Sequence, residues 1–593
     1  MKQGSCKGAT ALNGGRTGTK QLEITLERAK NLASRWRTGG PPHAGGRRVA
    51  REQSGGPPSD KAMEANTLRV LFLNPPDLGG QVWMKEVGRC GRRAIANELW
   101  PQTGLAYLAA MVEGEDHRAR IIDAMAEPMT LEELEKECHD WRPDVVIANS
   151  ATPTIRNDVA VLDRLSRAGS VMWGLVGPHA SALPEETLRE SAASFVLVNE
   201  AEETVADLVW RLADLMRVAE SEGPHTPYVV ERVTAALSGI KGMVWRLPDQ
   251  FAPTAGERIP GERGSRPAPF SSEIVVNPPR PLIANLNELP LPARHLLPNH
   301  VYRMPFFADH PFATVIPCRG CPWPCAFCRA GKVWGRRVRL RSVENVLEEL
   351  EILQRGFGVR HIVFMTDSLT LDRDWARRLF VGMRDLRRPV EWICNSRVDA
   401  VDAETLGLMK NAGCRLISYG VESASPEILS RSRKGISIEQ SERAILLTRQ
   451  AGILSMAYFV LGLPGETAES VEESIRFAQR LDPDYVNFHV ATPFPGTDLY
   501  EEALEKGWLT TRNWEDYEEE GSAVLRAGEL NPEDLVRAQA RAMRAFYMRP
   551  RRLAKELARL RGWSDFRAKM RAGLRTRSAL RRGKSPPSAS ERR

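Results

Sequence analysis

Short apolar runs alternate with amphipathic stretches in two separate parts of the chain, which span residues 67–217 and 312–506. Apolar runs of about four to eight residues between turn signals are typical of buried strands, whereas apolar positions three or four residues apart are typical of helices. Strands alternating with helices in the first part predict a doubly wound, Rossmann- or flavodoxin-like sheet, which binds ligands at the carboxyl ends of its strands. Its strands are predicted at 68–73, 118–122, 145–149, 171–176 and 195–198, and its helices at 103–113, 131–139, 156–167, 184–191 and 202–217.

The second part repeats the alternation in six further strand–helix units. Parallel strands joined by right-handed crossovers predict a partial (βα)6 TIM barrel, and a doubly wound sheet is the alternative architecture. The predicted fold class is therefore α/β, with two different α/β units in one chain. The strands of this part are predicted at 312–317, 361–366, 390–396, 415–421, 454–461 and 485–491, and the helices at 343–355, 373–385, 402–412, 438–451, 468–481 and 498–506.

The remaining segments lack this regular alternation. Residues 1–65 are rich in Gly, Arg, Ser and Pro, which predicts a disordered N-terminal extension, and Met63 offers an alternative start. We predict five segments, which are the extension 1–65, the first α/β domain 66–220, a linker and docking segment 221–300, the barrel 301–510, and a basic helical C-terminal extension 511–593. The last of these begins its helix at Pro532 and ends in a tail that we expect to be disordered.

Composition narrows the class of protein. A hydrophobic content of 42% supports substantial cores, and no apolar run approaches the ~20 residues that a membrane helix needs. Nine cysteines, an odd number, favour a reducing compartment over a disulfide framework, so we expect a cytoplasmic protein. The net charge of +8 is concentrated in 549–593, where a solvated basic helix is the first interpretation and contact with a membrane surface the second. No aromatic residues alternate with that charge, so we expect no specific nucleic-acid partner.

Four cysteines, Cys318, Cys321, Cys325 and Cys328, occur within eleven residues directly after the first predicted barrel strand. Clustered thiolates bind metal, and three arrangements are possible on spacing alone: a four-thiolate zinc site, a fully ligated iron–sulfur cluster, or a [4Fe–4S] cluster held by three thiolates with one open iron. The loop lies at the carboxyl end of the barrel, where barrel enzymes carry out their chemistry, which favours a catalytic site over structural zinc.

The spacing Cys321-x3-Cys325-x2-Cys328, with Phe327 before the last cysteine, resembles the signature of the radical S-adenosylmethionine (SAM) superfamily. The resemblance implies that these three cysteines hold a [4Fe–4S] cluster whose fourth iron binds SAM. Cys318 stands where a Ser or Thr is more usual, and we interpret it as the last residue of the strand and not a ligand.

Later strand ends resemble the same family, including Phe364-Met-Thr-Asp367, Asn395-Ser-Arg397, Gly420-Val-Glu422 and Leu461-Gly-Leu-Pro-Gly. For any one of these segments a turn is the simpler interpretation, but their order behind a three-cysteine loop is specific. The residues that the resemblance implies as SAM contacts are Phe327, Thr366, Asp367, Arg397, Gly420, Glu422 and Gly462.

Loops after the strands of the first part resemble the cobalamin-binding domain that precedes many radical SAM domains. They are Asn74-Pro-Pro, Ser150-Ala-Thr152, Gly177-Pro-His179 and Glu200-Ala-Glu202, and ordinary strand-to-helix turns are the alternative for each. The resemblance implies that Ser150, Thr152, Gly177 and His179 line the cobalamin. The Asp-x-His-x-x-Gly motif is absent, so the cobalt is expected to have no protein histidine ligand.

The resemblance therefore implies a cobalamin-dependent radical SAM enzyme. Its [4Fe–4S] cluster would cleave SAM to a 5′-deoxyadenosyl radical that removes hydrogen from an unactivated carbon, and methylcobalamin would then transfer a methyl group. The expected partners are a small-molecule or natural-product substrate and a one-electron donor of the flavodoxin or ferredoxin type. Two alternatives stay open, namely oxidative cyclisation or rearrangement with the same cofactors, and a non-catalytic zinc or iron–sulfur scaffold.

Overall fold

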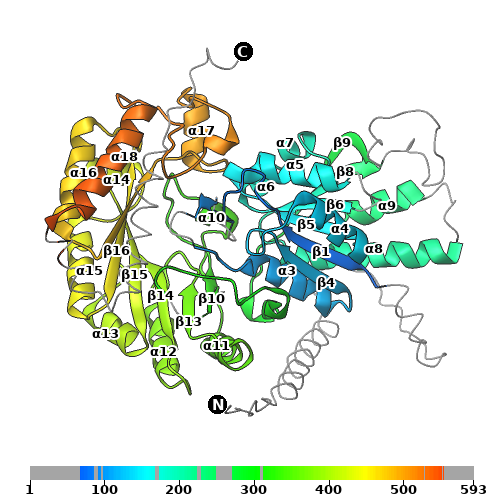
Figure 1. Cartoon of the computed structure of the whole chain (residues 1–593), viewed down its shortest axis with the longest axis horizontal. Coiled ribbons are helices and arrows are strands. Elements are labelled where there is room, and N and C mark those ends of the chain that lie inside the picture. The colour runs from blue at the N-terminus through cyan, green and yellow to red at the C-terminus, as the bar shows by residue number, and fades with distance from the viewer. Residues whose placement is uncertain are drawn as a thin grey trace, which may run out of the picture.

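The computed structural model of the chain describes residues 67–85, 91–94, 98–166, 172–222, 229–248, 270–307, 311–526, 528–550, 552 and 554. Two β-sheets with their surrounding helices lie next to each other and are joined by segments that run between them (Figure 1). The predicted N-terminal extension, 1–65, and the tail beyond residue 554 lie outside the described residues. No helix within the described ranges is long and apolar enough to cross a membrane.

The first sheet has the strand order β4-β1-β5-β6-β7-β8-β9. The strands from β4 to β7 are parallel, and the order reverses at β1, so the topological switch point lies between β1 and β5. This arrangement confirms the doubly wound, flavodoxin-like prediction. The parallel strands are β1 (Arg69–Asn74), β4 (Arg118–Asp123), β5 (Val145–Asn149), β6 (Met172–Val176) and β7 (Phe195–Leu197).

Helices cover both faces of this sheet because the side chains of each strand alternate between its faces. In β1, Val70 and Phe72 pack with the helices α3 and α8, whereas Leu71 and Leu73 pack with α4 and α5. Thr130 starts α4 with a reciprocal capping box that includes Glu133. The helices are α3 (Thr103–Gly114), α4 (Leu131–Trp141), α5 (Ile155–Ser166), α6 (Pro178–Ala182), α7 (Pro184–Arg189) and α8 (Glu202–Glu222).

Residues 221–300, predicted as a linker and docking segment, contribute to the first sheet. After α9 (Val229–Ser238), the strands β8 (Met243–Pro248) and β9 (Phe270–Val276) extend the sheet in antiparallel pairs beyond β7. A long Pro- and Gly-rich stretch separates these strands in sequence, which hides their pairing from an analysis of periodicity. The part that follows does dock, because Ile283 and Leu286 are buried in the core that the two sheets share.

The second sheet has six parallel strands whose spatial order is their chain order. This order fits a partial barrel and excludes a doubly wound sheet, in which the order would reverse. Helices lie along the outer side of the curved sheet (Figure 1). The strands are β10 (Phe312–Val315), β13 (His361–Phe364), β14 (Glu391–Ser396), β15 (Cys414–Glu422), β16 (Leu454–Leu461) and β17 (Tyr485–Val490), and the helices between and after them include α11 (Val343–Phe357), α12 (Arg373–Arg384), α13 (Ala403–Asn411), α14 (Pro426–Arg431), α15 (Ile438–Gln450), α16 (Ala468–Leu481) and α17 (Asp498–Glu505).

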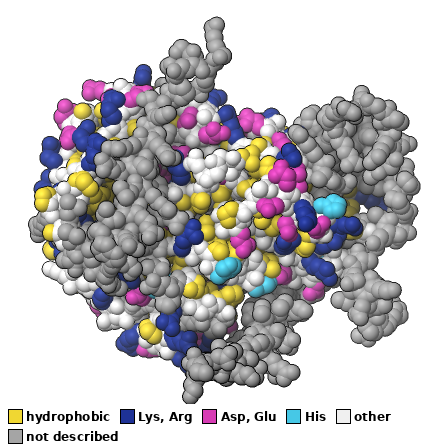
Figure 2. Space-filling model, viewed as in Figure 1, with side chains coloured by type: hydrophobic (Ala, Val, Ile, Leu, Met, Phe, Trp, Pro, Cys, Tyr) yellow, Lys and Arg dark blue, Asp and Glu magenta, His cyan; other side chains and the backbone are white. Residues whose placement is uncertain are grey.

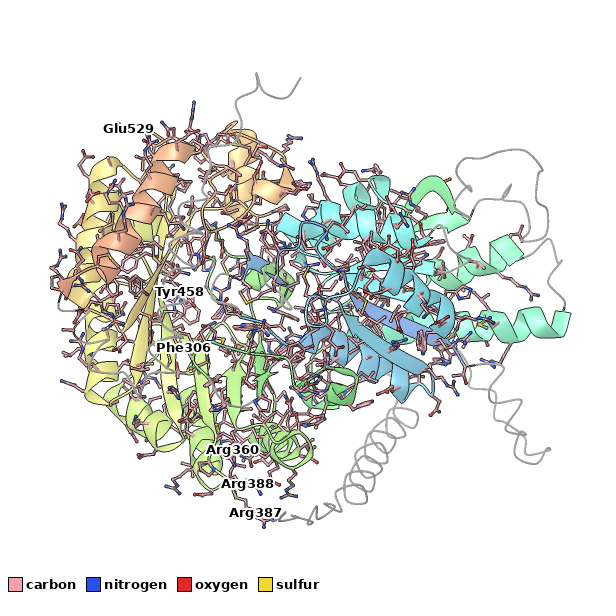
Figure 3. All side chains as sticks on the ribbon, in the orientation of Figure 1. Phe306, Arg360, Arg387, Arg388, Tyr458 and Glu529 are labelled. Atoms are coloured by element: carbon pink, nitrogen blue, oxygen red, sulfur yellow. The ribbon has the colours of Figure 1, made fainter. Side chains whose placement is uncertain are left out.

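The inner side of the barrel shares one core with the first sheet. Strand residues such as Val363 and Leu416 are buried together with Met304, Phe307 and the helix α3. Figure 3 shows Phe306 and Tyr458 on this inner side, away from the outer helices. In Figure 2, hydrophobic side chains gather over the middle of the visible face, between its more charged ends. The two sheets are therefore packed together by apolar contacts as well as by the ion pairs described below.

The C-terminal extension contacts both sheets. Its helix α18 (Pro532–Tyr547) begins at Asn531, which forms a capping box with Asp534, and packs on β16, β17 and α16. The preceding short helix η4 (Trp514–Asp516) packs instead on α5 of the first sheet. The extension thus bridges the carboxyl ends of strands that belong to different sheets.

Candidate functional site

The carboxyl ends of both sheets meet at the cysteine-rich loop. This loop follows β10, and the short helix α10 (Ala330–Val333) comes directly after it, between the two sheets (Figure 1). The buried Arg329 guanidinium donates a hydrogen bond to the carbonyl of Pro178, the first residue of α6, which follows β6. The loop that carries the thiols is therefore in direct contact with the ligand-binding edge of the first sheet.

Backbone contacts fix the loop at both ends. The short strand β11 (Cys318–Arg319) pairs with β12 (Arg339–Leu340), and the Cys321 amide donates to the Gly335 carbonyl at 3.0 Å. Gly320 has a φ of 100°, and a Cβ there would lie 2.2 Å from a backbone oxygen, so only glycine fits. At the other end, the Ala326 amide donates to the Ser432 carbonyl at 3.0 Å. The thiols between these anchors are thus presented by a fixed backbone.

The three thiols of the predicted cluster remain accessible. Cys321 and Cys325 are half-buried, and Cys328 is exposed. Desolvation by the surrounding protein atoms raises the pKa of the Cys328 thiol, although the side chain is exposed. Burial also raises the pKa of Cys321 to about 11, so these thiols need a bound metal to lose their protons at neutral pH.

In the described part of the chain, no three His, Cys, Asp or Glu side chains converge closely enough to hold one metal ion. A structural zinc needs four ligands at about 2.0–2.3 Å from a single point, whereas cysteines that hold an iron–sulfur cluster bind separate irons. The choice between the two arrangements rests on Cys318, the fourth thiol.

Cys318 is occupied by a different contact. It is buried, and its Sγ lies 2.8 Å from the Thr366 hydroxyl oxygen, beyond the end of β13. Burial raises the pKa of its thiol to about 12. Thr366, predicted as a SAM contact, therefore meets Cys318, and Asp367 follows it at the same strand end.

Arg397, also predicted as a SAM contact, stabilises the cysteine loop. Its guanidinium forms two hydrogen bonds of 2.9 Å with the Asp399 carboxylate and lies 3.8 Å from the centre of the Trp323 ring. It also donates to the Lys434 carbonyl at 3.1 Å. Because Trp323 lies between Cys321 and Cys325, these contacts fasten the middle of the loop to the end of β14.

The predicted pair Gly420 and Glu422 forms part of a buried ion pair. Glu422 has a φ of 66°, and its carboxylate lies 2.6 Å from the Lys434 ammonium. A Cβ on Gly420 would lie 2.2 Å from the Glu422 carboxylate, so the absence of a side chain makes room for the pair. Burial raises the pKa of Cys325, and the Lys434 charge is the largest opposing influence. Sequence analysis missed Lys434, which no motif or spacing distinguishes.

Gly462 is covered by the C-terminal helix. Its φ is 89°, and its amide donates to the Glu466 carboxylate at 2.5 Å. A Cβ on Gly462 would meet Leu535 of α18 at 2.6 Å. Phe327, the aromatic of the cysteine signature, is half-buried against a separate apolar cluster that includes Leu463. The Gly462 amide already has a hydrogen-bond partner in Glu466.

The buried carboxyl group of Glu466 should make the free energy of unfolding depend on pH. Burial raises the pKa of its carboxyl from 4.5 to about 7, so folding favours the neutral acid. The resulting stabilisation is complete below the ordinary pKa and is lost as the pH rises through about 7. We expect the wild type to lose roughly 3 kcal/mol relative to Glu466→Gln between pH 4.5 and 8, measured by urea unfolding. Glu473→Gln, at an exposed position of α16, is the control, and parallel profiles for wild type and Glu466→Gln would contradict the prediction.

The predicted cobalamin residues lie together at the ends of β5 and β6. The Ser150 amide donates to the Val176 carbonyl at 2.8 Å, and Gly177, with a φ of 126°, lies so close that a Cβ would be 2.0 Å from the Ser150 carbonyl oxygen. The Thr152 hydroxyl and the His179 Nδ1 are buried and have no hydrogen-bond partner among the described residues. Orphaned polar atoms beside small residues at a switch-point edge fit a polar, ring-shaped cofactor.

His179 lies between the cysteine loop and the C-terminal extension. Burial lowers its pKa to about 3, with a smaller contribution from the Arg329 charge, so the imidazole is neutral. The Trp514 ring packs edge to face against the His179 ring, with the ring centres 4.9 Å apart. The extension thus covers the ligand edge of the first sheet.

Two arginines that flank the cysteine loop bind two glutamates of the first sheet. Arg339 forms two hydrogen bonds with the Glu200 carboxylate, at 2.7 and 2.8 Å, and Arg319 lies 2.5 Å from the Glu202 carboxylate. All four side chains are buried. Glu200 also accepts from the Ile283 amide at 2.8 Å. Sequence analysis noted the glutamates as part of a motif but missed their partners, which are more than 110 residues away in the chain.

A polar cluster that sequence analysis missed lies inside the barrel on β16 and β17. The Tyr458 and His489 rings are 5.4 Å apart, and Asn487 donates to the Glu520 carboxylate at 2.9 Å. Tyr458 lies on the inner side of the sheet in Figure 3. Arg92, on the short strand β3 (Arg92–Arg93), adds a positive charge whose pKa is raised by Glu520 against the effect of burial. Three segments far apart in sequence thus enclose one face of the site.

Comparison with protein families gives two matches in one chain. The model of the B12 binding domain matches residues 92–209, and the model of the radical SAM superfamily matches residues 315–478. The first match covers most of the parallel part of the first sheet, and the second covers the cysteine loop and five of the six barrel strands at least in part.

Curated relatives cover most of the chain. An uncharacterised methyltransferase of Pyrococcus horikoshii is 34% identical over 84% of this chain and 97% of its own length. The anaerobic magnesium-protoporphyrin IX monomethyl ester cyclase of Rubrivivax gelatinosus is 27% identical over 74% of this chain and 70% of its own length. Among solved structures, the methyltransferase TsrM from Kitasatospora setae, with cobalamin and a [4Fe–4S] cluster bound, aligns with a TM-score of 0.54 and 19% identity over 75% of this chain and 76% of that chain.

Proposed function

This chain belongs to the radical SAM enzymes that carry a B12-binding domain, and we propose that it is a methyltransferase acting on an unactivated carbon of a small molecule. The observation that carries the proposal is the contact between the thiol loop and the edge of the first sheet, through Arg329 and Pro178. A methyl donor on one sheet and a radical source on the other can act on one substrate only if these edges face each other. The methyltransferase relative of Pyrococcus horikoshii supports the same function.

The cofactors of this family are a [4Fe–4S] cluster, SAM and cobalamin. We propose that Cys321, Cys325 and Cys328 each bind one iron, because their thiols are accessible and Cys318 is engaged with Thr366. When bound, the cluster and SAM supply a radical that removes hydrogen from carbon, and cobalamin supplies the methyl group. Arg397 stacks on Trp323, and Glu202 and Glu200 bind Arg319 and Arg339. These contacts would keep the two cofactor sites in a fixed position relative to each other.

For SAM we keep Thr366, Asp367 and Phe327 as proposed contacts. For Arg397 and the Glu422–Lys434 pair we propose instead that they hold the cysteine loop in place. For cobalamin we propose Ser150, Thr152, Gly177 and His179, since the orphaned Thr152 hydroxyl and His179 Nδ1 need polar partners.

We propose that the substrate meets the polar cluster inside the barrel. Tyr458, Asn487 and His489 share the inner face of adjacent strands, and Glu519 lies 3.6 Å from His489. Such a mixture of donors and acceptors suits a substrate with several hydrogen-bonding groups. The Trp514 segment covers the adjoining ligand edge of the first sheet, where its ring contacts His179.

We further propose a cytoplasmic location, since oxygen-sensitive thiols need a reducing compartment, and a one-electron donor of the flavodoxin or ferredoxin type. The proposed division of the chain is the B12-binding domain, extended here through β9 to Val276, the docking segment that follows, the barrel to about residue 510, and the C-terminal cover.

Anaerobic reconstitution with iron, sulfide and hydroxocobalamin tests the proposal without knowledge of the substrate. SAM with a deuterated methyl group and a chemical reductant are added, and 5′-deoxyadenosine and deuterated methylcobalamin are measured. We expect both products. Deoxyadenosine without methyl transfer to cobalamin would favour cyclisation, as in the cyclase relatives, and the absence of both products from a loaded protein would overturn the proposal.

A further inference from the structure

We propose that a basic patch beside the cysteine loop, formed by Lys332, Arg336 and Arg337 around the exposed Leu282, is the docking surface for an acidic one-electron carrier protein. The inference rests on the proposed function, because a cluster that cleaves SAM must be reduced before each cleavage. It adds where on this chain the electron enters and which charges select the donor.

The patch is fixed to the backbone of the thiol loop. Arg336 and Arg337 follow Gly335, whose carbonyl accepts the hydrogen bond from the Cys321 amide at 3.0 Å. The Arg337 carbonyl oxygen packs so closely against Gly320 that a Cβ there would be only 2.2 Å away. Lys332 is on α10, four residues after Cys328. A protein seated on this patch would therefore lie directly against the loop that holds the cluster.

The positive charge of the patch is not neutralised. Lys332, Arg336 and Arg337 are exposed, and neither arginine forms an ion pair among the contacts of the described residues. Lys332 lies 3.0 Å from Asp498, but Arg433 lies 2.5 Å from the same carboxylate, so two cations share one acid. The patch beside the cysteine loop thus carries a net positive charge that faces solvent.

The patch also has an apolar centre. Leu282 is 37% exposed, and its side chain lies over Gly335, where an added Cβ would be 2.4 Å from it. Protein interfaces commonly combine a small apolar centre with a charged rim, and the rim mainly governs the association rate and its salt dependence. These features fit a transient complex with a partner of opposite charge.

The partner that the chemistry requires is a reduced carrier with an acidic surface. In the transfer, the carrier loses one electron and the cluster gains that electron, passing from its 2+ to its 1+ state. No bond forms between the proteins. An acidic flavodoxin in its fully reduced state supplies the electron and is the probe for the experiments below.

The barrel provides a matched control at its other end. Arg387 and Arg388 are also adjacent and exposed, and they form no ion pair among the contacts of the described residues. They lie just before β14, at the amino end of the barrel strands, far from α10 in Figures 1 and 3. If net charge alone attracts the carrier, reversal of either pair weakens binding equally.

The first measurement is the Kd of flavodoxin for the reconstituted full chain by biolayer interferometry at two salt concentrations. We expect Arg336→Glu/Arg337→Glu to raise the Kd at least about tenfold at low salt and to flatten its salt dependence, since several exposed charge pairs are lost. Arg387→Glu/Arg388→Glu should change it less than about twofold. Equal effects of both double variants, or no effect of the first, would overturn the proposal, as would loss of binding to anionic vesicles without a change for flavodoxin.

The second measurement separates this proposal from the proposed function. Deoxyadenosine formation is driven either by reduced flavodoxin or by dithionite, a small reductant that needs no docking surface. We expect the Arg336→Glu/Arg337→Glu chain to keep its dithionite-driven rate and to lose most of its flavodoxin-driven rate. A wild type inactive with dithionite would contradict the function, whereas equal flavodoxin-driven rates in variant and wild type would contradict the docking surface alone.

Discussion

Replacement of Cys321 by alanine is expected to lower 5′-deoxyadenosine formation at least about 100-fold. Even residues that only orient metal ligands typically change metal affinity or activity by about 10–100-fold, and loss of a ligand itself should cost more. A cluster held by three thiolates has no spare protein ligand, and Cys318 is turned toward Thr366. We expect the same loss for alanine at Cys325 and at Cys328.

Cys318→Ala provides the contrast. The expected result is a full complement of iron and sulfide and a deoxyadenosine rate within about threefold of wild type, because the variant removes only a buried contact with Thr366. Cys138→Ala, at a half-buried thiol on α4, controls for the loss of any cysteine. Iron and sulfide analysis and the visible spectrum of each reconstituted variant accompany the assay. Loss of the cluster in Cys318→Ala, with zinc bound to the wild type, would instead identify a four-thiolate site.

Local patterns predicted most of the fold. The buried strands β1 and β5 are continuous apolar runs, as expected for parallel strands covered on both faces, whereas β16 and β17 of the barrel alternate buried with half-buried residues over much of their length. The pairing of β8 with β7 and with β9 was not predictable, because 21 residues separate β8 from β9 in the sequence. Sequence periodicity carries no information about such partners.

The site was predictable only where one short segment contains it. The three cysteines lie within eight residues, so their spacing points to a metal site, and the family resemblance narrows this to a [4Fe–4S] cluster. Arg397 shows the limit of such reasoning. Its position at the end of a strand that resembles the family predicts a SAM contact, but its contacts with Trp323 and Asp399 show that it holds the cysteine loop. The polar cluster around Tyr458 and His489 has no local signal, since its members come from three distant segments.

The ion pairs between the sheets lead to the second large expected effect. Glu200→Ala leaves Arg339 buried without its carboxylate and removes one of the two acids near Arg319. Removal of one partner from a buried ion pair typically costs about 3–5 kcal/mol, because the remaining charge is left desolvated and unpaired. We expect a loss of stability of this size in urea unfolding, together with weaker retention of corrinoid after desalting. Glu185→Ala, which breaks an exposed pair with Arg189, should cost less than about 1 kcal/mol.

A double-mutant cycle distinguishes a specific pair from general damage to the fold. The variants are Glu200→Leu, Arg339→Met and their combination, which replaces the bidentate pair by apolar groups of similar volume. We expect the double variant to be more stable than the sum of the single losses predicts, by about 1–3 kcal/mol, because neither charge is then left unpaired. It should also retain cobalamin yet couple SAM cleavage to methyl transfer poorly, since these pairs hold the thiol loop in register with the first sheet. Additive losses would mean that the glutamate and arginine act independently, and the orientation of the two cofactor edges would then depend on the apolar core between the sheets.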